Sequence, residues 1–292
     1  MISLAAIRYR SVLSSDGGPI ESIEEGTWEV LGKRYFQANA RLRTDLVPRR
    51  SMQVYGDADG TGMALSPMVA RHIAISEALE RWAHFEISRS SRRSIFGFDV
   101  DWSSNGMAAF PGITKFPARR AARYEAIERF CLLNWWERHI DGKLCETAWH
   151  GVSAISFEAI EGIYAVILFK KSELGLYAYG HAAAGSLQDA CARAITELFR
   201  HESAIRSWVL ANKDVAPTNT FERRAWFFST EEGHSNFQER LGIHKAHSRP
   251  SCESICDSEI EGPWSNYATI WRYLLPPPSE RFMSKENNYF FW

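Results

Sequence analysis

Two short segments of the chain repeat one carboxylate–arginine pattern. Residues 76–82 read SEALERW and residues 124–130 read YEAIERF, 48 positions apart when counted from Glu77 to Glu125. Residues three and four apart share one face of a helix, so each copy presents two carboxylates and an arginine as one cluster. Two such clusters in one fold are a candidate cation site. Their members are Glu77, Glu80, Arg81, Glu125, Glu128 and Arg129.

The same pattern is also an ordinary surface ion pair, worth about 0.2–0.5 kcal/mol. Its repetition favours a cation site over a surface ion pair, because both copies are expected on strongly apolar helices. These helices are expected at roughly Pro67 to Ile87 and Ala118 to His139. Helices of this kind face a core or a cleft, where unpaired carboxylates are costly. We therefore expect a positive group to meet both clusters.

A third helix, expected over Leu187 to Asn212, carries Arg193 and Glu197 at a spacing of four. A helix salt bridge is the plain alternative for this pair. The preceding segment 180–186, GHAAAGS, consists mostly of small residues, which let backbone approach a ligand closely. Three helices therefore carry carboxylate–arginine pairs after glycine-containing segments.

The bulk composition indicates a globular protein. The chain has 292 residues, 45% of them hydrophobic, and a formal net charge of −1. That charge gives no overall basic field for nucleic acid. No segment approaches the about 18 apolar residues of a membrane span, and the start does not resemble a secretory signal, so we expect a cytoplasmic protein. The five cysteines are an odd, scattered set, and we expect them to be reduced.

Strand patterns alternate with the three helices, which predicts an α/β fold. A glycine-punctuated loop, Gly56 to Gly62, is expected to open the first motif helix, and the last eighty residues look less regular. The expected strands are Ser94 to Val100, Leu144 to Ser156, Ile163 to Lys170 and Leu174 to His181.

Single residues exclude two known ligand-binding loop motifs. A phosphate-binding P-loop needs Gly-Lys at the helix start, and here Met63 follows Gly62. An EF-hand needs a carboxylate where this chain has Met68. A structural turn, or a backbone anion contact at a helix start, remains open. A zinc site at His244, His247, Cys252 and Cys256 fits the usual spacings poorly, and ordinary loop polarity is the preferred interpretation.

Taken in order, the motifs resemble those of the YcaO superfamily, whose members use ATP to activate backbone amides. The resemblance covers about residues 56–202. It rests on Gly-x-Gly before the first Glu-x-x-Glu-Arg, on Ser-Asn-Gly-x-Ala before the second, and on Arg-x-x-x-Glu in the third helix. The matching residues are Gly60, Gly62, Glu77, Glu80, Arg81, Ser104, Asn105, Gly106, Ala108, Glu125, Glu128, Arg129, Arg193 and Glu197.

The resemblance implies a YcaO-like α/β fold with mixed sheets flanked by helices and a nucleotide site between the three motif helices. It implies one domain over residues 1–292, with a motif core at about 56–202 and a less regular part at about 213–292. It also implies ATP and Mg²⁺ as cofactors. The implied metal ligands are Glu77, Glu80, Glu125, Glu128 and Glu197, and the implied nucleotide contacts are Asn105, Arg193, Arg81 and Arg129.

The implied activity is an ATP-dependent cyclodehydratase that forms thiazoline or oxazoline rings in a ribosomally made precursor peptide. A leader-peptide-binding partner protein is implied, with a flavin-dependent dehydrogenase as a further candidate. The alternatives are a thioamide- or amidine-forming enzyme of the same family and a scaffold whose ATP site has decayed. Three departures from the family pattern, Ile73, Phe110 and Arg200, favour the scaffold.

The sequence identifies no general base, although the carboxylate of Trp292 is one candidate. The family and the aromatic segment Tyr289 to Trp292 make a homodimer an option, because an exposed apolar patch favours being covered. Docking of the same segment against the rest of its own chain would cover the apolar surface equally well.

Overall fold

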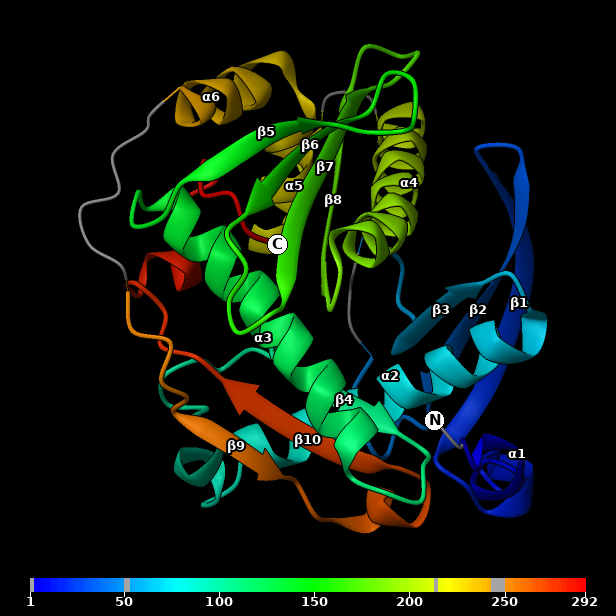
Figure 1. The fold of residues 1–292 in the computed structure, drawn as a ribbon. Helices are drawn as coiled ribbons and strands as arrows, with labels where there is room; N and C mark the ends of the chain where they lie inside the picture. The colour runs from blue at the N-terminus through cyan, green and yellow to red at the C-terminus, as the bar shows by residue number, and fades with distance from the viewer. Residues whose placement is uncertain (1–2, 50–52, 213–214, 243–249) are drawn as a thin grey trace. The chain divides into compact units, whose positions relative to one another are not determined.

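The computed structural model describes residues 3–49, 53–212, 215–242 and 250–292. The chain forms two compact units: residues 1–50, 57–126 and 254–275 make up the first, and residues 51–56, 127–253 and 276–292 the second. The division falls within one helix, α3 (Phe116–Trp136). Both units combine sheet and helix (Figure 1), which confirms the predicted α/β class. The prediction of a single domain stays a prediction.

In the first unit, helix α2 lies across an antiparallel sheet of order β1-β2-β3 (Figure 1). The predicted first motif helix is confirmed, because α2 runs over Pro67–Ser88 and begins at a proline. Proline suits the first helical position, since it lacks an N–H that would have no partner there. The strands and the short helices before them are β1 (Ile20–Val30), β2 (Lys33–Leu42), β3 (Gly60–Ala64), α1 (Ala5–Arg8) and η1 (Ser14–Asp16).

The glycines before α2 belong to a strand, so the expected loop from Gly56 to Gly62 is wrong over its last residues. A Cβ at Gly60 would clash with the carbonyl oxygen of Ala74, and one at Gly62 with that of Ala70. Ala70 and Ala74 are themselves fully buried. The glycines thus let β3 approach the backbone of α2, which is a packing role rather than a loop role.

A second sheet of the first unit has the order β4-β10-β9. The predicted strand from Ser94 to Val100 is wrong, since a 3₁₀ helix, η2 (Arg93–Phe96), occupies its start. Gly97 follows in the left-handed region with a φ of 68°, which ends the helix and prevents an extended run. The remaining elements are β4 (Met107–Phe110), β9 (Cys256–Glu259), η3 (Pro263–Asn266) and β10 (Thr269–Leu274).

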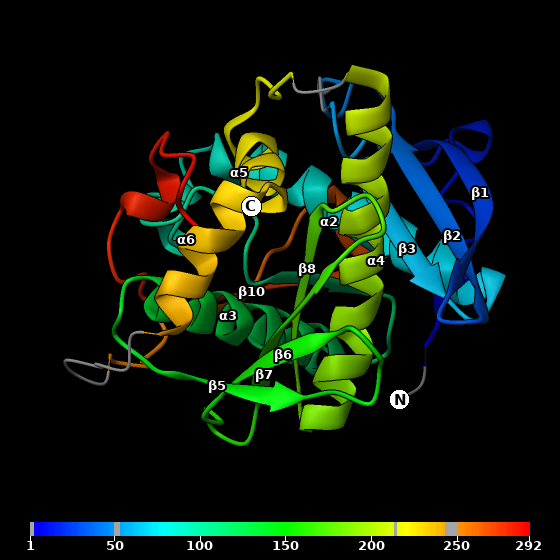
Figure 2. The ribbon, with the colours of Figure 1, turned by 90° about the horizontal axis from the view of Figure 1, so that it is seen from above.

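The second unit contains an antiparallel sheet of order β5-β6-β7-β8, with α4 running along it (Figure 2). Helix α4 spans Leu187–Asn212, as predicted. The predicted strand from Leu144 to Ser156 is broken by a turn in which Gly151 has a φ of 74°. The strands are β5 (Gly142–Glu146), β6 (Ser153–Phe157), β7 (Tyr164–Lys171) and β8 (Tyr177–Ala184), so the last two predicted strands are confirmed with shifted ends.

The last part of the chain is more regular than expected. It contains α5 (Thr220–Ser229), α6 (Glu231–Leu241) and η4 (Arg281–Met283) besides β9 and β10. The aromatic segment is buried within the second unit, with Tyr289 and Phe290 both 0% exposed. The rings of Trp135 and Phe228 pack against Phe290. The segment docks within the chain, so it gives no reason for a homodimer.

All five cysteines are free in the structure, and their expected reduced state stays a prediction. Among the described residues, no helix has both the length and the apolar character needed to cross a membrane.

Replacing Gly62 by alanine should lower the free energy of unfolding by about 3 kcal/mol, because the new methyl group meets the backbone of α2. Gly26→Ala is the matched control: it also lies in a strand, but nothing stands within 4 Å of its Cβ position. Urea unfolding of both variants checks this. Equal midpoints for the two variants would contradict the packing role of Gly62.

Candidate functional site

Helix α2 places the first cluster beside the segment that leads into β3. The Glu77 carboxylate accepts a hydrogen bond from the backbone N–H of Thr61, with 2.9 Å between Oε2 and N. Arg81 donates from Nε to the carbonyl oxygen of Asp59 at 2.8 Å. Arg81 Nη2 also lies 3.9 Å from Glu77 Oε1. One motif glutamate and its arginine thus fasten residues 59–61 to the helix.

Glu80 is a buried carboxylate of the first unit with a strongly raised pKa. Burial raises its pKa well above the ordinary value, and the negative charges of Glu125 and Glu77 raise it further. The positive charges of Arg81 and Arg272 oppose this rise without cancelling it. Three of the predicted metal ligands therefore repel one another within this unit. A divalent cation among them would remove that repulsion.

Asn105 lies in a tight turn before β4. Its side-chain nitrogen donates to Ser103 Oγ, and the next residue, Gly106, has a φ of 71°. A Cβ at Gly106 would clash with the carbonyl oxygen of Tyr273, whose own N–H donates to the Gly106 carbonyl at 2.7 Å. Only glycine fits this position, which explains the Ser-Asn-Gly spacing in physical terms.

Arg272 holds this turn in place, and the sequence interpretation missed it. The residue is 0% exposed, and its guanidinium donates at 2.6–3.3 Å to four carbonyl oxygens. Burial lowers its pKa. An arginine inside the apolar strand β10 was the available signal, because a buried cation must find acceptors. The four acceptors belong to Phe96, Asp101, Ser103 and Asn105.

In the second unit, Glu128 meets a histidine that was not predicted as a site residue. Glu128 Oε1 lies 2.6 Å from Nδ1 of His181 on β8. Burial of the Glu128 carboxylate raises its pKa, but the charge and hydrogen bond of His181, with the charges of Arg129 and Arg193, outweigh burial. The pKa of Glu128 is therefore lowered, the opposite of Glu80.

Arg129 contacts the aromatic segment of its own unit. Its guanidinium carbon lies 4.8 Å from the centre of the Phe291 ring, and Nη1 donates to the carbonyl oxygen of Trp292 at 3.2 Å. Within the described chain, its Nε is buried without a hydrogen-bond partner. Arg129 thus holds the segment in place.

Glu197 on α4 forms an ion pair with Arg200, with 2.9 Å between Oε1 and Nη1. Arg200 is one of the three departures from the family pattern, and it places a positive charge beside a predicted metal ligand. Arg193, one turn before Glu197, is exposed and contributes positive charge near Glu128.

The predicted site residues form two groups. The first unit contains Glu77, Glu80, Arg81, Asn105 and Glu125, and the second contains Glu128, Arg129, Arg193 and Glu197. A single nucleotide site between α2, α3 and α4 would combine both groups, and it stays a prediction. Across the described residues, no three His, Cys, Asp or Glu side chains are already arranged to hold a metal ion. His244 and His247 of the weak zinc pattern lie outside the described residues.

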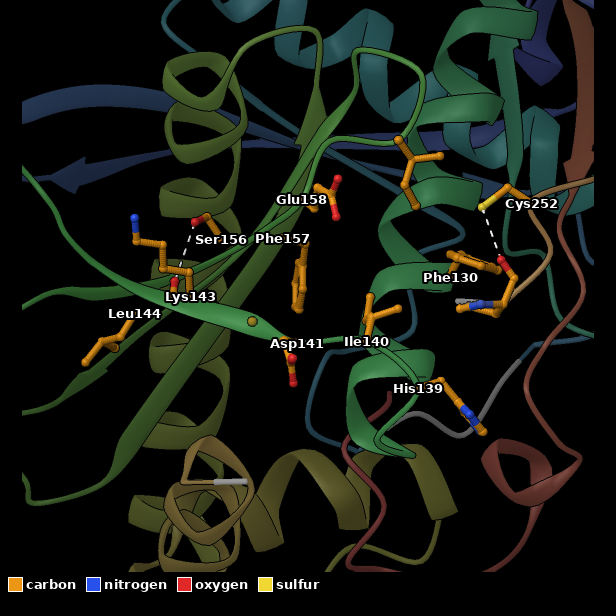
Figure 3. Close-up of a pocket in the computed structure, with 13 residues that line it drawn as sticks. Phe130, His139, Ile140, Asp141, Lys143, Leu144, Ser156, Phe157, Glu158 and Cys252 are labelled. Atoms are coloured by element: carbon orange, nitrogen blue, oxygen red, sulfur yellow. Dashed lines mark hydrogen bonds between the residues drawn. The ribbon is translucent and has the colours of Figure 1, made fainter. Parts of the chain in front are cut away.

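The sequence interpretation also missed a cavity of about 690 Å³ in the second unit (Figure 3). Phe130 of α3 and Phe157 of β6 contribute apolar surface, and Lys143 and Glu158 contribute charge. The residues that line the cavity come from segments far apart in sequence, so no local sequence pattern could predict it. The lining is Phe130, His139, Ile140, Asp141, Gly142, Lys143, Leu144, Ser156, Phe157, Glu158, Ile160, Pro250 and Cys252.

The sequence matches no protein-family model and no curated relative. Solved structures do match. YcaO from Methanopyrus kandleri, bound with AMPPCP and Mg²⁺, is 16% identical with a TM-score of 0.52, over 96% of this chain and 91% of that chain.

The E. coli microcin synthetase McbBCD complex also contains a similar chain. It is 11% identical with a TM-score of 0.52, over 87% of this chain and 86% of that chain. The same complex with pro-MccB17 bound matches at 11% identity and a TM-score of 0.54, over 86% of this chain and 87% of that chain. The chain therefore has a YcaO-like α/β fold, as the motifs predicted.

Replacing Glu80 by glutamine should stabilise the metal-free protein at neutral pH, because burial and then the neighbouring negative charges disfavour the ionised carboxylate in the folded state. A folded-state pKa above the unfolded one means that Glu80 favours folding only while protonated, and this contribution is lost as the pH rises through the folded-state pKa. The gain of the variant should vanish below about pH 4.5, the ordinary pKa of glutamate, where both states are protonated. Thermal unfolding in a chelator across this range checks the difference. A variant less stable than wild type at neutral pH would contradict the assignment.

Proposed function

We propose that the protein uses Mg²⁺ and ATP to activate backbone amides of a ribosomally made precursor peptide, as a cyclodehydratase. The observation that carries the proposal is the buried Glu80 carboxylate beside Glu77 and Glu125: burial raises its pKa most, and the two negative charges raise it further. Coupled carboxylates on motif helices favour a divalent cation, and the YcaO-like fold supports the same chemistry. The similar protein from M. kandleri was solved with an ATP analogue and Mg²⁺.

The carboxylates fit Mg²⁺ in chemical type and in their mutual repulsion, since this ion prefers hard oxygen ligands. The bound metal would neutralise phosphate charge during phosphoryl transfer. We assign metal binding to Glu77, Glu80, Glu125, Glu128 and Glu197. Asn105, Arg193, Arg81 and Arg129 are assigned to the nucleotide.

In the proposed reaction, a thiol or hydroxyl of the peptide attacks the preceding amide carbonyl and releases its proton to solvent. The carbonyl oxygen takes the γ-phosphoryl group of ATP, leaving ADP. The phosphorylated oxygen then departs as phosphate, and the amide nitrogen loses its proton to form the ring C=N bond. An amide oxygen is otherwise a poor leaving group, so positioned positive charge at the phosphates supplies much of the rate gain.

We propose that the protein works with a precursor peptide and a leader-peptide-binding partner, with a flavin-dependent dehydrogenase as a further candidate. The similarity to a chain of the McbBCD complex, solved also with pro-MccB17 bound, supports this setting. We further propose a cytoplasmic location. Thioamide or amidine formation would use the same nucleotide chemistry with a different nucleophile.

A non-catalytic scaffold is the second candidate, and the ion pair between Arg200 and Glu197 favours it. A fixed guanidinium on a predicted metal ligand competes with a cation for that carboxylate. Such a scaffold would bind the precursor peptide or a partner enzyme without binding Mg²⁺ and nucleotide.

Calorimetric titration with Mg²⁺ and a non-hydrolysable ATP analogue tests the proposal without a partner protein. Glu77→Gln and Glu125→Gln should each weaken metal-dependent binding at least about tenfold, because each removes a negative oxygen ligand. Glu86→Gln is the matched control, since Glu86 is an exposed residue of the same helix α2. Its affinity should equal that of wild type.

Failure of the folded wild-type chain to bind the analogue, repeated with partner proteins present, would contradict the enzyme and support the scaffold. Binding unaffected by either motif substitution would contradict the assigned ligands.

A further inference from the structure

The side chain of His181 faces away from α4 because of the alternation of strand β8. Ala178 and Ala182 belong to the hydrophobic cluster shared with Ala194 and Leu198 of α4. Gly180 approaches the backbone of α4 so closely that a Cβ there would clash with it. Since successive side chains of a strand point to opposite faces, the odd-numbered His181 lies on the other face.

On that face, His181 meets the motif glutamate of α3. Nδ1 lies 2.6 Å from Glu128 Oε1, and the two side chains are only 15% and 13% exposed. His181 is also fixed in register, because it pairs with Ile167 of the neighbouring strand β7. In β8 it is the one residue that is not fully buried. The imidazole ring of His181, in a strand of small and aromatic residues, thus contacts the carboxylate of Glu128.

We propose that His181 is a positioning residue for Glu128: its Nδ1–H holds Oε1, so that the second oxygen, Oε2, is presented to the metal ion. The inference rests on the proposed function, in which Glu128 is a metal ligand. A glutamate side chain has three rotatable bonds, and a hydrogen bond to one oxygen fixes the direction of the other. Residues that support a metal ligand in this way typically account for about 10- to 100-fold in metal affinity.

A plain structural ion pair is the competing explanation, and it differs in one measurable respect. A structural pair would stabilise the metal-free fold and leave metal affinity unchanged. A positioning residue changes the affinity for the metal complex while nucleotide binding measured without metal stays as in wild type.

The test uses three substitutions and Mn²⁺ as a spectroscopic substitute for Mg²⁺. His181→Phe removes the donor, His181→Asn places an amide nitrogen near the position of Nδ1, and His181→Gln places it near Nε2, away from Glu128. Electron paramagnetic resonance would follow Mn²⁺ binding to the full chain with AMPPCP. We expect about 10- to 100-fold weaker Mn²⁺ binding for Phe and Gln, and recovery to within a few-fold of wild type for Asn.

Each outcome decides between the possibilities. Equal Mn²⁺ affinity of wild type and His181→Phe, or of the Asn and Gln variants, would overturn the positioning role while leaving the proposed function intact. If His181→Phe does not fold, the comparison of Asn with Gln still decides. A folded wild-type chain that binds no Mn²⁺ with AMPPCP, either alone or with partner proteins present, would overturn the proposed function, and the role of His181 with it.

Discussion

Burial of the Glu80 carboxylate beside two further carboxylates is the constraint on which the proposed site depends. The helix that carries Glu77 and Glu80 is positioned by apolar packing. The buried alanines of α2 pack against the glycines of β3, and this contact holds the helix against the sheet. Glu125 adds a third negative charge. Desolvated like charges destabilise a fold unless something positive meets them. The first unit supplies Arg81 and Arg272, and these leave the pKa of Glu80 raised.

The motif glutamate of the second unit, Glu128, has a different electrostatic environment from Glu80. His181, Arg129 and Arg193 supply enough positive charge to lower the pKa of Glu128 despite burial. Glu197 likewise has a protein partner in Arg200. The two copies of the motif are therefore not electrostatically equivalent. In the first, two arginines leave the pKa of Glu80 raised, whereas in the second the neighbouring positive charges lower the pKa of Glu128. In the proposed site, the first cluster gains most from a cation, and the second depends more on the direction in which its carboxylate is held.

The long helices α2 and α4 followed from sequence, and α2 has a clear start at Pro67. Motif order also predicted the YcaO-like fold. Single-residue backbone effects were missed: Gly97 ends η2, Gly151 breaks a strand, and Gly60 belongs to one. Long-range partners were missed for a different reason. Arg272 and His181 act on segments distant in sequence, and no local spacing reveals such contacts.

The central claim is that a cation relieves the repulsion around Glu80, and proton release on ligand binding tests it most directly. Titration calorimetry of the wild-type chain with Mg²⁺ and an ATP analogue, in two buffers of different ionisation enthalpy and at several pH values, measures the protons exchanged. The account predicts net proton release at pH values where Glu80 is partly protonated, because a nearby cation lowers the raised pKa. Release should be absent in Glu80→Gln. Tight binding with the same proton exchange in both proteins would contradict the claim.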